Sequence, residues 1–169
     1  MIVTQAVRKQ PRLPAVSARP EVFLYPAWRG HGVYCDAFGM PSGKYEVWGQ
    51  GRRKDPNQDG APDAGCVIID YLTRLDTGVE NAFEWAIRTN QGPRFRAHDR
   101  LSGQEARGMI TPTGFSWTYK LLHRTPFGVR RCTVEAVFEV RGTEASTSTT
   151  LSLMGVTVGT SSSHIRHLG

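Results

Sequence analysis

Apolar and polar residues alternate along the chain from about Gly30 to Gly159, in one short segment after another. A period of two places alternate side chains on opposite faces of a β-strand, so each segment has one buried and one exposed face. No stretch shows the period of a helix, and the pattern therefore predicts an all-β protein. In the clearest segment, residues 79–88, the apolar face carries Val79, Asn81, Phe83, Trp85 and Ile87.

Turn residues divide this pattern into nine or ten strands. Short turns such as Asp76-Thr-Gly78 and Arg141-Gly-Thr-Glu144 favour hairpins between consecutive strands. Repeated hairpins predict an antiparallel up-and-down, lipocalin-like barrel of about nine or ten strands. The expected strands are residues 30–38, 44–50, 66–76, 79–89, 95–99, 104–110, 115–123 and 129–141, followed by one or two within 146–160. Residues 22–25 are a candidate first strand.

Length and proline content predict two parts of unequal size. The chain has 169 residues, of which 39% are hydrophobic, and this suits one domain with a core of useful size. We predict a single barrel domain over residues 21–169. Residues 1–20 contain Pro11, Pro14 and Pro20, which should hold them as an extended arm.

The expected arm is the most basic part of the chain, with Arg8, Lys9, Arg12 and Arg19 and no acidic residue. The net charge is +6, and without these four the chain has 17 basic and 15 acidic residues. Such an arm cannot bury enough apolar surface to order itself, so we expect it to dock on other protein subunits. Its acid-poor start is similar to mitochondrial targeting segments, which predicts a mitochondrial location, with the cytoplasm as the alternative.

A second basic group follows the period of a strand. Arg94, Arg96, His98 and Arg100 would form one stripe on the outer face of the barrel. Such a stripe suits acidic protein or anionic lipid headgroups. Nucleic acid is not favoured, because sheets that bind RNA interleave exposed aromatic residues with the basic ones. No segment approaches the roughly 20 apolar residues of a membrane-spanning helix.

The sequence contains no motif for nucleophilic catalysis, neither a Gly-x-Ser-x-Gly turn nor a cysteine beside a plausible base. We therefore expect a protein that is not an enzyme. Should the barrel act on a ligand, polar residues that could point into its lumen would carry that chemistry. These candidates are Tyr34, Asp36, Asp70, Tyr119 and His123.

We predict neither a metal nor a cofactor. The loop from Asp55 to Asp63 is similar to a calcium loop, but Cys66 stands where the bidentate glutamate is needed, so a solvated loop is favoured. The three cysteines, Cys35, Cys66 and Cys132, are an odd number, and each lies in a predicted strand. They are expected to be free core residues of a protein in a reducing compartment.

Four short pieces occur in a recognisable order: Arg29-Gly-His-Gly-Val-Tyr34, Asp76-Thr-Gly-Val-Glu80 through Trp85-Ala-Ile87, Gly114-Phe-Ser-Trp-Thr-Tyr119 and Met154-Gly-Val-Thr-Val-Gly159. Over about residues 23–166 the chain resembles a bacterial lipocalin-like (calycin) family catalogued as a domain of unknown function. The resemblance implies a barrel fold.

The chain departs from that family at polar positions. Where that family tends to have an arginine, this chain has Phe83. It has residues 135–138 in place of an Asp-Asp-Trp run, Thr147 in place of an asparagine and Leu153 in place of a lysine. Because buried polar groups need partners, losing several together implies that a shared interior network is absent. We therefore predict a non-catalytic accessory subunit of a larger assembly. The alternative is a barrel that binds or converts a small apolar ligand.

Overall fold

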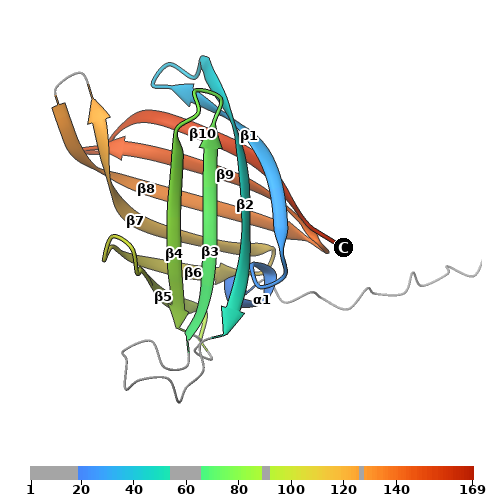
Figure 1. The fold of residues 1–169 in the computed structure, drawn as a ribbon. Helices are drawn as coiled ribbons and strands as arrows, with labels where there is room; N and C mark the ends of the chain where they lie inside the picture. Colours follow the sequence, from blue (N-terminus) through green and yellow to red (C-terminus); the bar gives the residue numbers. More distant parts are fainter. Residues whose placement is uncertain (1–18, 54–65, 89–91, 126–127) are drawn as a thin grey trace, which may run out of the picture.

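The computed structural model describes residues 19–53, 66–88, 92–125 and 128–169. Ten antiparallel strands follow one another around a closed barrel, and the pairing of β1 with β10 completes it (Figure 1). This arrangement confirms the predicted all-β up-and-down barrel. The strands are β1 Trp28–Asp36, β2 Pro41–Arg53, β3 Cys66–Leu75, β4 Glu80–Arg88, β5 Arg94–Asp99, β6 Glu105–Thr111, β7 Gly114–Thr125, β8 Gly128–Arg141, β9 Glu144–Leu153 and β10 Val156–His167.

The alternation that predicts the strands also describes their faces. In β4, Trp85 and Ile87 are buried in the core of the barrel, whereas Glu80 and Arg88 are exposed. β3 departs from simple alternation, because all four of its first residues, Cys66–Ile69, are buried. Cys66, Ile68 and Ala86 form a second, smaller apolar cluster, separate from the core.

A tight turn divides residues 146–160 into two strands. Met154 and Gly155 have φ angles of 50° and 82°, and two consecutive residues with positive φ are typical of the two-residue hairpins that match strand twist. Glycine adopts this conformation without steric cost, and the Met154 side chain is almost fully exposed. Because this turn separates β9 from β10, the barrel has ten strands, the larger of the two predicted numbers.

The prediction of a first strand at residues 22–25 is wrong, because these residues belong to a one-turn helix and its end. Helix α1 spans Pro20–Phe23, with proline in its first turn, where the missing N–H costs nothing. Val22 is exposed, but Phe23 and Leu24 are both buried. Two adjacent buried residues do not fit the period of a strand with one exposed face.

Helix α1 closes one end of the barrel. The Phe23 side chain is fully buried in the core, and the Trp28 indole nitrogen donates a hydrogen bond of 3.2 Å to the Leu24 carbonyl oxygen. His167 Nε2, near the end of β10, lies 2.8 Å from the Phe23 carbonyl oxygen and donates to it. These bonds join the helix to both strands that complete the barrel.

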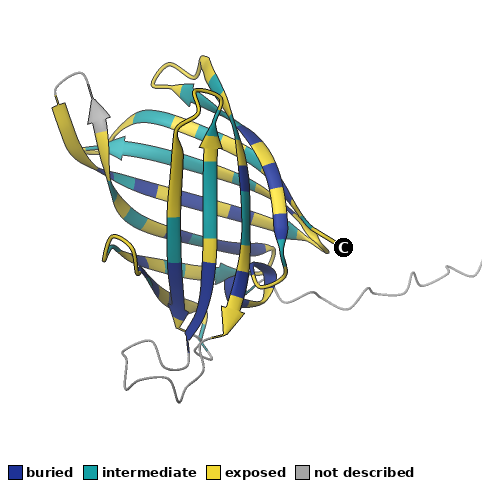
Figure 2. Cartoon of the chain, viewed as in Figure 1, coloured by how far each residue is buried: buried dark blue, intermediate teal, exposed yellow. Residues whose placement is uncertain are grey.

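Burial decreases toward the opposite end. β3 and β4 are buried where they lie near α1 and become intermediate or exposed toward the turn between them (Figure 2). β5 and β6 are short, and β4 pairs with β5 only over its last four residues, Trp85–Arg88. Beyond the β5–β6 turn, no described strand lies between β4 and β7. The barrel is therefore packed at one end and wider at the other.

Several sequence predictions fall outside the described residues, namely those on Arg8, Lys9 and Arg12 of the arm and on the loop from Asp55 to Asp63. Arg19 is described, and its Nε lies 2.5 Å from Glu21 Oε1. The three cysteines are thiols rather than disulfides, with Cys66 and Cys132 buried and Cys35 half-buried. No helix within the described ranges is long and apolar enough to span a membrane.

We predict that Phe23→Ala lowers the free energy of unfolding by about 3–5 kcal/mol, because it empties a fully buried site at the closed end of the barrel. Val22→Ala, at the neighbouring exposed position, should change it by less than about 0.5 kcal/mol. Urea unfolding followed by tryptophan fluorescence measures both. Equal effects of the two changes would contradict the helical arrangement of this segment.

Candidate functional site

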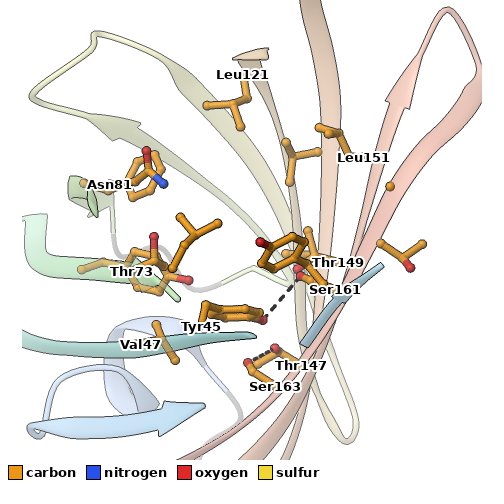
Figure 3. A pocket seen from close by; sticks show the side chains of 18 of the residues that line it. Tyr45, Val47, Thr73, Asn81, Leu121, Thr147, Thr149, Leu151, Ser161 and Ser163 are labelled. Atoms are coloured by element: carbon orange, nitrogen blue, oxygen red, sulfur yellow. Dashed lines mark hydrogen bonds between the residues drawn. The ribbon is translucent and has the colours of Figure 1, made fainter. Parts of the chain in front are cut away.

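A cavity of about 560 Å³ occupies the wider part of the lumen. Its deepest lining residue on β1 is Trp28, next to α1. Toward the open end it is lined by residues nearer to the hairpin turns, among them Asn81, Leu121 and Leu151 (Figure 3). The cavity therefore runs from the packed core to the open end of the barrel.

Aromatic side chains form one wall of the cavity. The Phe83 and Trp85 rings stack at 6.1 Å with an interplanar angle of 13°. Tyr71 packs against Phe83 at 5.7 Å, and Tyr119 meets the edge of Trp85 at 5.1 Å. Flat aromatic surfaces of this kind favour contact with other planar, apolar groups.

Hydroxyl groups line another part of the wall, on β9 and β10. The Tyr45 hydroxyl lies 3.4 Å from Ser161 Oγ, and Thr147 Oγ1 lies 2.5 Å from Ser163 Oγ (Figure 3). Thr149 lines the cavity beside them. This side can offer hydrogen bonds, whereas the aromatic side offers mainly apolar contact.

A glycine in β1 allows Tyr45 to reach β10. A Cβ atom at Gly32 would lie 2.5 Å from the Tyr45 ring and 2.3 Å from the Ser162 carbonyl oxygen, so no other residue fits without a shift. The ring therefore crosses β1 against bare backbone and places its hydroxyl next to Ser161. This contact explains the second glycine of the Arg29-Gly-His-Gly motif.

The lumen keeps its deeper tyrosines neutral. Burial raises the pKa of Tyr119 to about 12, and the nearby Asp99 carboxylate adds to this shift. Burial raises the pKa of Tyr71 well above its ordinary value, and the neighbouring Tyr119 and Tyr45 phenols act in the same direction. Both hydroxyls therefore retain their protons, and can donate hydrogen bonds, at any physiological pH.

Four of the five predicted lumen residues, Tyr34, Asp36, Tyr119 and His123, do line the cavity. Two of them have structural contacts. The Tyr34 hydroxyl lies 3.4 Å from Asp76 Oδ1, and Asp36 Oδ1 accepts hydrogen bonds from the backbone N–H groups of Phe38 and Met40. Asp36 thus shapes the β1–β2 turn rather than serving as a free carboxylate.

The fifth residue, Asp70, lies outside the barrel, contrary to the prediction that it points inward. Its Oδ2 is 3.1 Å from Arg52 Nε, and Arg52 also pairs with Glu84. The neighbours Ile69 and Tyr71 point into the core and lumen instead. The sequence pattern did not show to which face of β3 the Asp70 side chain points, because the first residues of β3 are apolar on both faces.

The predicted basic stripe lies on the outer face of the barrel. In β5, Arg94, Arg96 and His98 alternate with the buried Phe95 and Ala97. Beyond the strand, Arg100 pairs with Glu84 at 3.3 Å. The stripe also extends across strands, since Arg96 pairs in register with Arg88 of β4 and Arg107 of β6. Partners at this surface remain a prediction.

Sequence reasoning missed most of the residues that line the cavity. Their signal was present, because polar members of the inward-facing alternation, such as Tyr71 and Thr73 in β3 and Thr147 and Thr149 in β9, share their face with apolar residues. Within the described part of the chain, no cluster of three or more His, Cys, Asp or Glu side chains could hold a metal ion.

Two solved structures share this fold. An S-type phycobiliprotein lyase, CPES from Guillardia theta, aligns with a TM-score of 0.62 and 6% identity over 88% of this chain and 90% of that one. Rv2717c from M. tuberculosis aligns with a TM-score of 0.58 and 14% identity over 87% of this chain and 94% of that one.

No family model matches the sequence, and no curated protein matches it either. The structural likeness shows a shared barrel fold and assigns no family. The sequence resemblance to one bacterial family stays a prediction. Two of the positions at which the chain departs from that family, Phe83 and Thr147, line the cavity.

We predict that the free energy of unfolding falls as the pH rises above 10, the ordinary pKa of tyrosine, because the unfolded chain then loses a proton that native Tyr119 keeps up to about pH 12. Tyr119 alone should lower the free energy of unfolding by about 1.4 kcal/mol per pH unit over this range. Tyr119→Phe should remove this contribution. Urea unfolding of both proteins at pH 7 and between pH 10 and 12 measures the difference, and parallel pH profiles would contradict the prediction.

Proposed function

We propose that this protein binds a small, largely apolar ligand in the lumen of its barrel. The observation that carries the proposal is the cavity of about 560 Å³ with one stacked aromatic wall. Pockets of about 300–1,000 Å³ are typical of small-molecule sites, and most of them are lined by apolar residues with a few polar groups. The alternative reached from the sequence is thus favoured over the accessory-subunit interpretation.

The charges of the lining support an uncharged ligand. Among the described residues that line the cavity, none is a lysine or an arginine. An anionic group in the lumen would therefore lose its hydration without gaining a countercharge, which is costly. This feature disfavours ligands that bury a carboxylate or a phosphate.

The lining favours binding over conversion. Its ionisable groups besides the tyrosines are Cys35, Asp36 and His123, and Asp36 is already bonded to a turn. The phycobiliprotein lyase is an enzyme with this fold, so chemistry on a bound ligand is the second candidate. At 6% identity, the likeness transfers no residue roles.

The accessory-subunit hypothesis remains a prediction, as does a mitochondrial location. It depends chiefly on the basic arm, and Arg8, Lys9 and Arg12 lie outside the described residues. Docking of the arm on another protein is compatible with an occupied lumen, because α1 closes the barrel end nearest to the arm.

Titration with N-phenyl-1-naphthylamine, a neutral dye whose emission rises in apolar surroundings, tests the proposed function. We expect saturable binding of one dye per chain. Thr149→Trp, which fills the lumen, should weaken binding by about tenfold or more, equivalent to about 1.4 kcal/mol.

Thr150→Trp is the matched control. Thr150 is the next residue in β9, points to the other face and does not line the cavity, so dye affinity should stay within about twofold of the wild type. Circular dichroism verifies that both variants fold. Equal loss of affinity in the two variants, or no saturable binding by the wild type, would refute a lumen site.

A further inference from the structure

Two tyrosine hydroxyls in the lumen have no partner in the described part of the chain. Neither Tyr71 nor Tyr119 has a hydrogen bond to a described residue, whereas the Tyr45 hydroxyl is within reach of Ser161. The rings of Tyr71 and Tyr119 are enclosed by their aromatic neighbours and face the cavity. Both residues are half-buried and line the cavity, so hydroxyls without a partner among the described residues are available to a molecule that enters it.

The nearest carboxylate does not supply a partner for Tyr119. Asp99 raises the pKa of Tyr119, but its oxygens accept hydrogen bonds from β4 and from the β5–β6 turn. These come from the backbone N–H groups of Glu84 at 2.7 Å and Ser102 at 3.1 Å, and from the Ser102 hydroxyl. The Tyr119 hydroxyl is therefore available to a molecule in the cavity.

The two phenols flank a flat surface. Tyr71 contacts Phe83 on one side of the stacked pair, and Tyr119 contacts Trp85 on the other. The Phe83 and Trp85 rings lie 6.1 Å apart, so the four side chains form one continuous aromatic cluster. All four residues line the cavity, so a planar compound packed against this cluster has both tyrosines as neighbours.

We propose that the Tyr71 and Tyr119 hydroxyls donate hydrogen bonds to the carbonyl oxygen of a planar, uncharged ring compound that lies on the Phe83–Trp85 surface. This inference rests on the proposed function and names its ligand class. A carbonyl oxygen accepts two hydrogen bonds and brings no proton of its own, which suits two neutral donors. It also carries no charge, which suits a lining without lysine or arginine.

Fluorenone and fluorene form a matched pair of probes. They have nearly the same size and planarity, and only fluorenone has a carbonyl group. We expect the wild-type protein to prefer fluorenone, and the double variant Tyr71→Phe/Tyr119→Phe to reduce the ratio of the two affinities by about tenfold or more. Competition with the bound dye measures both affinities.

Tyr25→Phe is the control variant, because Tyr25 is exposed and does not line the cavity. It should leave the ratio of affinities within about twofold of the wild type. The infrared carbonyl stretch of bound fluorenone gives a second measurement. It should lie at lower frequency in the wild type than in the double variant, because hydrogen bonds weaken the C=O bond.

The outcomes separate the two proposals. If fluorene and fluorenone bind with a ratio that the double variant does not change, the tyrosine pair does not recognise a carbonyl group, while the lumen remains a binding site. If neither probe displaces the dye and neither binds directly, both the carbonyl inference and the proposed function are refuted.

Discussion

The pairing of β1 with β10 is the interaction on which the rest of the structure depends. Nine residue pairs, from Trp28 with His167 to Asp36 with Gly159, join the first strand to the last and close the sheet. Closure removes the two sheet edges and creates an inside that is shielded from water. It also places the hydroxyls of β10 next to Tyr45 of β2, with only the glycine-containing β1 between them.

The packed core and the cavity lie at different ends of this closed barrel. Near α1, fully buried side chains such as Phe23, Ile69 and Phe115 fill the barrel and leave no room for a ligand. Toward the open end, the short β5 and β6 leave β4 and β7 without a strand between them, and the lining becomes a mixture of aromatic and hydroxyl groups. The packed end can thus hold the walls in place around the cavity at the open end.

The fold could be predicted from the sequence because a period of two depends only on local residue order. The strands, their hairpins and most inward faces followed from it. α1 could not be found in this way, because it is a single turn whose buried residues, Phe23 and Leu24, are adjacent in sequence. Its position depends on bonds to Trp28 and His167, which are contacts of the closed barrel.

The candidate site was predictable only in part. Tyr34, Asp36, Tyr119 and His123 line the cavity, but simple alternation does not explain all of them, because consecutive residues line it in 34–36 and 121–123. Asp70 was misplaced because the start of β3 is buried on both faces. The unpaired state of Tyr71 could not be inferred, since it depends on which side chains reach across the lumen from other strands.

The indole N–H resonances of the four tryptophans offer the most direct test of the central claim that the lumen binds a small apolar ligand. Trp85 and Trp117 line the cavity, whereas Trp48 lies outside it, with the Arg74 guanidinium 5.2 Å from its ring centre. In a two-dimensional NMR titration with fluorene, we expect saturating shifts for Trp85 and Trp117 and little change for Trp48. Shifts confined to Trp48, or none at saturating fluorene, would contradict it.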